Sequence, residues 1–135
     1  GDVRSAIAAV DAVPDTSSEY VAAQLAAVAA VLAGSRLGRL DEAGLRAAAA
    51  RVERLSLDPA TDHRVRATLY DAAVALAWGS TGNGSAPLLG CRWEPRELRL
   101  ALERTLRASA RLATRVEERV ALVDRANSVR PRTWV

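Results

Sequence analysis

Three features of this 135-residue sequence have residue types that could do chemistry, and each lacks what that chemistry requires. The glycine-rich run over residues 79–85 lacks the Gly-Lys-Ser/Thr ending of a phosphate loop, and it follows a predicted helix instead of a strand. His63 is the only histidine and has no carboxylate or cysteine partner at metal-ligand spacing. Cys91 is the only cysteine, which excludes an internal disulfide. We therefore predict no catalytic, cofactor-binding or metal-binding residue and no small-molecule substrate.

Arginines gather on one side of the helix predicted over residues 95–113. They could track a phosphate backbone, which makes a helical nucleic-acid-binding module the alternative function. Glutamates interrupt the pattern, since Glu103 and Arg107 are spaced as an i,i+4 ion pair. The face also lacks the aromatic residues on which bases stack. The pattern favours a solvated face with internal ion pairs, leaves an acidic protein partner open, and predicts no contact with nucleic acid.

Some large apolar and cationic side chains fall at loop, tail or outward-facing positions. Exposed groups of these types mark a protein contact surface only if they cluster, because aromatic residues and arginine are enriched at interfaces. The residues that could form such an interface are Trp93, Arg96, Arg99, Leu100, Arg107 and Trp134.

The composition is that of one small helical domain covering residues 1–135. Half of the residues are apolar, phenylalanine and methionine are absent, and the net charge is only +3. No stretch has the length and hydrophobicity of a membrane span, and the start lacks a secretory signal pattern. A single cysteine fits a reducing compartment, so we expect a cytoplasmic protein. A start at Gly1 without methionine suggests a piece of a longer protein.

Caps, breakers and the 3.6-residue period predict six helices. Asp41 is a candidate N-cap, Pro59 and Pro95 favour helix starts, and Pro131 prevents continuation. Thr16 with Glu19, and Thr114 with Glu117, have the spacing of capping boxes. A polar, glycine-rich loop is expected over residues 79–90, and no β-sheet. The predicted helices cover residues 3–13, 17–33, 41–55, 61–78, 95–113 and 115–129.

The apolar faces predict how these helices pack. The second and fourth helices are apolar on more than one side, so they should be covered from several directions. We favour an all-α array of stacked antiparallel helical hairpins, although a three- or four-helix bundle could give the same pattern. The last helix should cap the array by burying Val116, Val120 and Val123. The expected core is Val21, Leu25, Val28, Leu32, Val52, Leu69, Leu76, Leu102, Leu106 and Val120.

Parts of the sequence are similar to the C-terminal tetratricopeptide domain of the actinobacterial protein kinase G family. The run over residues 54–59 is similar to the Leu-x-Leu-Asp-Pro junction between tetratricopeptide repeats, although any repeat here is degenerate. The segments that resemble the family domain are Asp11-Ala12-Val13-Pro14, Thr16-Ser17-Ser18-x-Tyr20, Ala22-Ala23-Gln24-Leu25-Ala26, Leu98-Arg99-Leu100, Leu106-Arg107-x-x-Ala110-Arg111 and, most specifically, Leu122-Val123-Asp124-x-Ala126-Asn127-x-Val129-Arg130-Pro131.

The resemblance implies a degenerate tetratricopeptide-like solenoid from a larger serine/threonine kinase. The sequence has no lysine to hold ATP phosphates and no His-Arg-Asp or Asp-Phe-Gly motif, so this chain should not phosphorylate anything. The implied role is scaffolding. The implied partners are the kinase core of the same chain, a second copy in a homodimer and a regulatory protein. The parent family is linked to phosphorylation of a forkhead-associated regulator.

Overall fold

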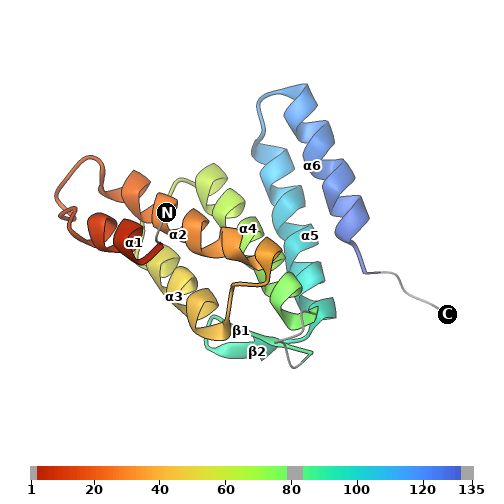
Figure 1. The fold of residues 1–135 in the computed structure, drawn as a ribbon. Coiled ribbons are helices and arrows are strands. Elements are labelled where there is room, and N and C mark those ends of the chain that lie inside the picture. Colours follow the sequence, from red (N-terminus) through yellow and green to blue (C-terminus); the bar gives the residue numbers. More distant parts are fainter. Residues whose placement is uncertain (1–2, 79–83, 132–135) are drawn as a thin grey trace.

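The computed structural model describes residues 3–78 and 84–131, apart from the side chains of residues 3, 4, 36 and 37. Within that part, six α-helices, one 3-10 turn and a small β-hairpin follow one another along the chain (Figure 1). Their bounds are α1 Val3–Asp11, α2 Tyr20–Ala33, η1 Gly34–Leu37, α3 Glu42–Glu53, α4 Pro59–Trp78, β1 Ala86–Leu88, β2 Cys91–Trp93, α5 Pro95–Leu112 and α6 Val116–Val129.

Successive helices pack as antiparallel neighbours, which confirms the predicted array of stacked hairpins. Helix α1 contacts α2, α2 contacts α3, α4 contacts α5, and α5 contacts α6. Helix α4 also contacts α2, α3 and the hairpin, and it lies between the α1–α3 group and the α5–α6 pair (Figure 1). This central place explains why α4 must be apolar on more than one side.

Aspartate side chains cap two helix starts, and Asp41 is the one that was predicted. The Asp41 side chain accepts a hydrogen bond of 2.7 Å from the Gly44 N–H, so it satisfies one of the unpaired donors of α3. Asp58 accepts bonds from the Thr61 N–H at 3.1 Å and from the Thr61 hydroxyl at 2.7 Å. Helix α4 therefore starts at Pro59, two residues before the predicted start.

The two predicted capping boxes are wrong. Helix α2 begins at Tyr20, because residues 14–19 form turns in which the Ser17 hydroxyl accepts from the Glu19 N–H at 3.2 Å. Helix α6 begins at Val116 after an extended Arg115, with no side-chain cap. The short connection to α5 is instead held by Arg119, which donates to the Ala113 carbonyl at 3.0 Å.

The segment before α5 forms a β-hairpin, so the predictions of a loop through residue 90 and of no β-sheet are wrong there. Strands β1 and β2 are antiparallel, with Ala86 opposite Trp93 and Leu88 opposite Cys91. The Trp93 indole N–H donates to the Leu88 carbonyl at 2.8 Å. Ala86 and Leu88 are buried, because β1 packs on α3 and α4. Residues 79–83 of the predicted loop lie outside the described part.

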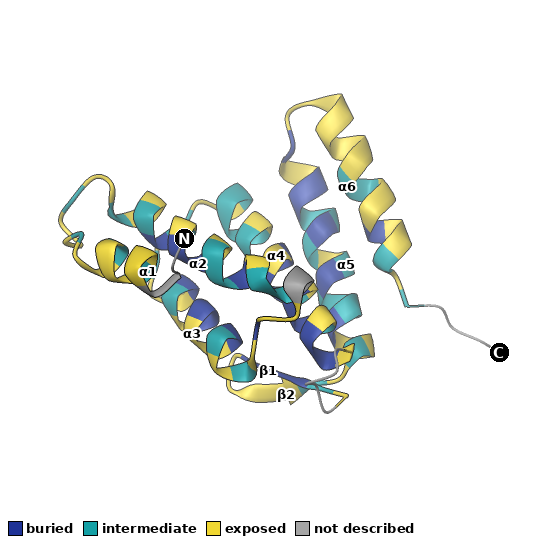
Figure 2. Ribbon diagram, in the orientation of Figure 1, coloured by how far each residue is buried: buried dark blue, intermediate teal, exposed yellow. Residues whose placement is uncertain are grey.

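Two clusters of side chains form the core. Figure 2 marks the buried residues in dark blue along the ribbon. The larger joins α2, α3, α4, β1 and the start of α5, and Leu45 and Leu98 are its largest fully buried side chains. The smaller joins α4, α5 and α6 around Leu102 and Leu106. The core residues predicted correctly are Val28, Leu32, Val52, Leu69, Leu76, Leu102 and Leu106.

The other three predicted core residues are not buried. Leu25 is half-buried, Val21 is 38% exposed and Val120 is 53% exposed. The burial expected for α2 is therefore only partly correct, since one of its faces, which includes Ala22, Ala26 and Ala29, remains open to solvent. Alanine exposes little apolar area, so an uncovered alanine face costs little free energy.

A polar cluster fastens the first three helices together. The Arg51 guanidinium of α3 donates to the Asp11 carboxylate of α1 at 2.9 and 3.2 Å, and to the Gln24 side-chain oxygen of α2 at 2.9 Å. Gln24 is buried, so this bond satisfies a polar group that would otherwise be costly to bury. The hydrogen bond from Arg51 holds the pKa of the Asp11 carboxyl below its usual value.

Acid is expected to weaken the fold through Asp11, Glu42 and Asp58. Hydrogen bonds from Arg51, Arg92 and Thr61 respectively lower the pKa of each carboxyl below its ordinary value, 3.8 for aspartate and 4.5 for glutamate. The folded chain therefore binds fewer protons than the unfolded chain, and this stability is lost as the pH falls through the lower folded values. We expect the urea midpoint to be level from about pH 7 to 5 and to fall towards pH 3.

Asp11→Asn tests this assignment, with Asp15→Asn as the matched control on the exposed turn. The Asp11 variant should unfold at a lower urea concentration at neutral pH and lose less stability on acidification. An acid profile identical to that of the unmodified chain would mean that the Asp11–Arg51 pair contributes nothing to it.

Candidate interaction surfaces

The arginine face predicted for α5 is divided by contacts with its neighbours. The Arg99 Nε donates to the Val129 carbonyl at the end of α6 at 2.9 Å, and its guanidinium carbon lies 5.5 Å from the centre of the Trp78 ring. Arg107 donates to Glu103 at 2.8 and 3.0 Å and to the Asn127 side chain of α6 at 2.8 Å. Both arginines therefore join α5 to α6, and Arg96 stays exposed at the start of the helix. These contacts support internal pairing more than phosphate contact.

Trp93 and Leu100 come together at the junction of the hairpin, α4 and α5. The ring centres of Trp93 and Tyr70 lie 6.2 Å apart at 57°, a tilted arrangement typical of packed aromatic side chains. Both Trp93 and Leu100 are half-buried and line an open cavity of about 420 Å³ with Tyr70 and Arg104. Two of the predicted interface residues therefore share this cavity, and Trp134 lies outside the described residues.

A stripe of three aliphatic side chains on the α5–α6 pair is exposed, which sequence reasoning missed. Leu112 is 44% exposed, Val116 66% and Val120 53%. We call these three residues the α6 stripe. Helix α6 instead turns Leu122, Ala126 and Val129 towards α5, so the prediction that Val116 and Val120 are buried is wrong and Val123 is half-buried. The signal was present in the sequence, because α6 carries apolar residues on two faces and α5 can cover only one.

Trp78 is a second exposed apolar group that sequence reasoning missed. It ends α4 and is 62% exposed, with Arg99 over its ring. An exposed tryptophan paired with arginine has the composition that dominates binding energy at protein interfaces. Its sequence position, immediately before Gly79, places it at a helix end, where a side chain escapes coverage more easily.

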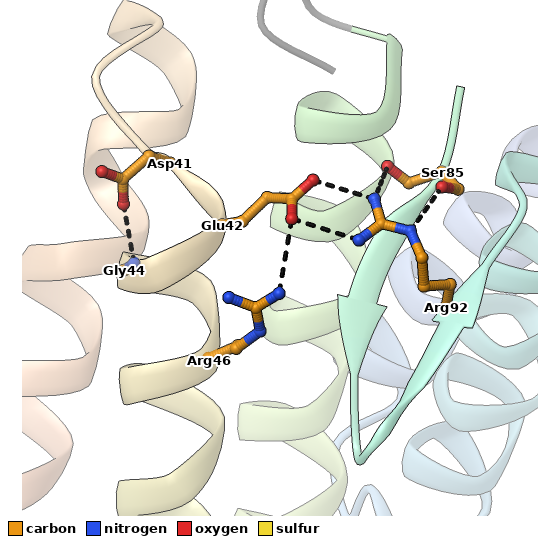
Figure 3. A network of polar contacts seen from close by, with 6 residues as sticks. All are labelled: Asp41, Glu42, Gly44, Arg46, Ser85 and Arg92. Carbon is orange, nitrogen blue, oxygen red and sulfur yellow. Dashed lines mark hydrogen bonds and ion pairs between the residues drawn. The ribbon is translucent and has the colours of Figure 1, made fainter. Parts of the chain in front are cut away.

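A third surface lies between α3 and the hairpin. Figure 3 shows the Glu42 carboxylate between two arginines: Arg92 of β2, at 2.8 and 3.1 Å, and Arg46 of α3, at 3.5 Å. Arg92 also donates to the Ser85 hydroxyl at 3.0 Å. The hydrogen bond from Arg92 lowers the pKa of Glu42. Arg46 and Arg92 of this network also line a groove of about 520 Å³.

The described residues hold no cluster of three or more histidine, cysteine or acidic side chains that could bind a metal ion. His63 is half-buried in the first turns of α4, and Cys91 is exposed at the start of β2. Over the described residues, no helix combines the length and hydrophobicity needed to cross a membrane.

Comparisons with known proteins match nearly the whole chain to one family. The family model described as protein kinase G tetratricopeptide repeat matches residues 1–133. The serine/threonine-protein kinase PknG of Mycobacterium leprae is 37% identical over 135 residues, and that of Mycolicibacterium smegmatis is 36% identical over 132 residues. Each match covers 97% of this chain but only 17% of the kinase. The helical array and these matches agree, and the chain belongs to the family of protein kinase G tetratricopeptide repeat domains.

Proposed function

We propose that this chain is the scaffold domain of a cytoplasmic, PknG-like serine/threonine kinase. In this role it braces the kinase core of the same protein and supports dimerisation or the docking of a partner protein. Family membership supports the proposal, because a tetratricopeptide domain suggests protein–protein interaction in general. The matched region is 17% of each PknG relative, which supports the proposal that this chain is a non-catalytic part of a larger kinase.

The observation that carries the proposal is the α6 stripe. Val116 and Val120 are more than half exposed and Leu112 is 44% exposed, whereas the side of α6 that packs on α5 carries Leu122, Ala126 and Val129. A helix that only capped the array would favour polar residues at these positions. Val116 and Val120 are one helical turn apart on α6, and exposed aliphatic side chains that cluster mark a contact surface. Acidic Glu117 and Asp124 lie exposed on the same helix.

The double variant Val116→Ser, Val120→Ser tests the α6 stripe. In the full-length kinase that carries this domain, we expect the double variant to weaken dimers in sedimentation velocity or to increase hydrogen exchange where the core contacts α6. Val21→Ser on α2, where the valine is 38% exposed, is the matched control. Unchanged association and unchanged exchange in the double variant would refute a role for this surface.

The isolated chain should not bind ATP. It has no lysine to hold the phosphates and no metal-binding cluster among its described residues. Calorimetric titration with ATP and Mg²⁺ should show no specific binding. A micromolar site would contradict the scaffold assignment for the chain.

A further inference from the structure

The groove between α3 and the hairpin is built by one face of the helix. Arg46, Ala49, Ala50 and Glu53 follow one another at i, i+3, i+4 and i+7, so they share one side of α3 and all line the groove. Ala49 and Leu88 are buried beneath it, and Leu89 at the hairpin turn borders it. The groove therefore has an apolar middle between a cationic and an anionic residue of α3.

Leu89 has a backbone conformation and an exposure that are unfavourable for a leucine. Its φ of 54° is the only positive value among the non-glycine residues that the structure describes. Together with Gly90 at φ 80° it forms the turn of the hairpin, where asparagine, aspartate and glycine are favoured because they tolerate this conformation. Its side chain is also 43% exposed. A leucine that is both backbone-strained and exposed points to a use outside the fold, because strained residues concentrate at functional sites.

The charges at the two ends of the groove are of opposite sign. At the first end, Arg46 and Arg92 share the single carboxylate of Glu42, and Arg46 holds it only at 3.5 Å with 59% of its side chain exposed. At the second end, Glu53 and Asp62 share the single guanidinium of Arg66, at 3.1 and 3.0 Å. Counted over these ion pairs alone, the first end has one more cation than anions and the second end one more anion than cations. Beside Glu53, the exposed Arg54 donates its Nε to the Ala50 carbonyl at 3.3 Å.

The separation of these charges sets the size of the occupant. Seven residues of helix separate Arg46 from Glu53, which is about 10 Å along the axis. A segment in the extended polyproline II conformation advances about 3.1 Å per residue and has three residues per turn. Residues three positions apart therefore span about the same length and lie on one side of the segment. A groove of about 520 Å³ has room for a short segment but not for a folded surface.

We propose that this groove binds a segment of a separate protein in the extended polyproline II conformation, with an acidic residue and a basic residue three positions apart and aliphatic residues between them. The acidic side chain meets Arg46, the basic side chain meets Glu53, and the aliphatic side chains lie over Ala50 and against Leu89. The site differs from the α6 stripe, which lies on the α5–α6 pair, away from the hairpin (Figure 1). The proposal therefore does not depend on the proposed scaffold function.

Two synthetic peptides of identical composition test the charge spacing. The first, Gly-Gly-Glu-Leu-Leu-Lys-Gly-Gly, separates its charges by three positions, and the second, Gly-Gly-Leu-Glu-Lys-Leu-Gly-Gly, places them side by side. Each carries a fluorophore at its N-terminus, and binding to the complete 135-residue chain is followed by fluorescence anisotropy. We expect the first peptide to bind at least fivefold more tightly than the second. Equal affinity, or no binding of either at millimolar protein, would overturn the proposal.

Three variants locate the binding. Arg46→Glu should weaken the first peptide at least fivefold, whereas Arg111→Glu, at an exposed position near the end of α5, should not. Leu89→Gly should raise the melting temperature, because glycine adopts a positive φ freely, and at the same time weaken the peptide. Opposite effects on stability and binding separate a docking role from a structural one.

The same experiment identifies other occupants. Unchanged affinity in Leu89→Gly would mean that the leucine is no anchor, which overturns the proposal. Self-association that the peptide does not displace, yet that Arg46→Glu abolishes, would assign the groove to a second copy instead. The double variant Val116→Ser, Val120→Ser should leave peptide affinity unchanged. The scaffold function and the peptide groove are therefore tested by different variants, and one can fail without the other.

Discussion

Truncation after Ala113 should convert the chain into an aggregating or partly molten product. Helix α6 covers α5 with Leu122, Ala126 and Val129, and its removal would expose Leu102 and Leu106 to water. Each of these leucines is 1% exposed in the intact chain. Re-exposing a buried leucine costs about 1.5–3 kcal/mol, and small domains have only about 5–15 kcal/mol in total. Circular dichroism and dye binding would show retained helices with a broad, weakly cooperative transition.

The control keeps α6 and changes only its exposed face. Val116→Ala, Val120→Ala should melt as cooperatively as the original chain, because these side chains are not part of the core. If instead the truncated chain melts cooperatively within a few degrees of the original, α6 does not stabilise the array. It would then be a separate element that is free for a partner.

Leu102→Ala is expected to be among the most damaging single substitutions. The leucine lies in the cluster where α4, α5 and α6 meet, beside Leu106 and Ala126. A buried leucine replaced by alanine leaves a cavity and costs about 2–5 kcal/mol. Equilibrium urea unfolding should show the loss as a lower midpoint with an unchanged slope.

Val120→Ala is the matched comparison on the same helix pair. Its valine is 53% exposed, so its cost should stay within about 0.5 kcal/mol. A loss comparable to that of Leu102→Ala would mean that the exposed face of α6 is covered in solution, for instance by a second copy. Measurement at several protein concentrations would then distinguish a dimer from a monomer.

The helices were predictable because their signals are local. Asp41 caps α3, Asp58 and Pro59 start α4, and Pro131 follows the end of α6, as the sequence indicates. Local signals failed where other contacts form instead of the predicted caps. Before α2, the Ser17 hydroxyl accepts from the Glu19 N–H in a turn. Before α6, Arg119 donates to the Ala113 carbonyl. The family resemblance was also available from the sequence and is confirmed by the matched model.

The candidate surfaces were much less predictable than the helices. The sequence places arginines on one side of α5, but it does not show that Arg99 and Arg107 reach α6. The apolar pattern of the sequence also predicts that Val120 is buried, whereas its side chain is 53% exposed. Both outcomes depend on which side of α6 meets α5, and a helix with two apolar faces leaves that open.

The sequence by itself determined the helical class, the order of the helices and the central place of α4, because propensity, capping and the width of an apolar face are properties of single segments. Only the tertiary structure decided that residues 86–93 pair as a hairpin, that the α6 stripe faces solvent and that Leu89 borders a groove with opposite charges at its ends. These features arise from contacts between distant segments. A pattern read along one segment does not contain them, because free energy is lowered by the packing of all segments together.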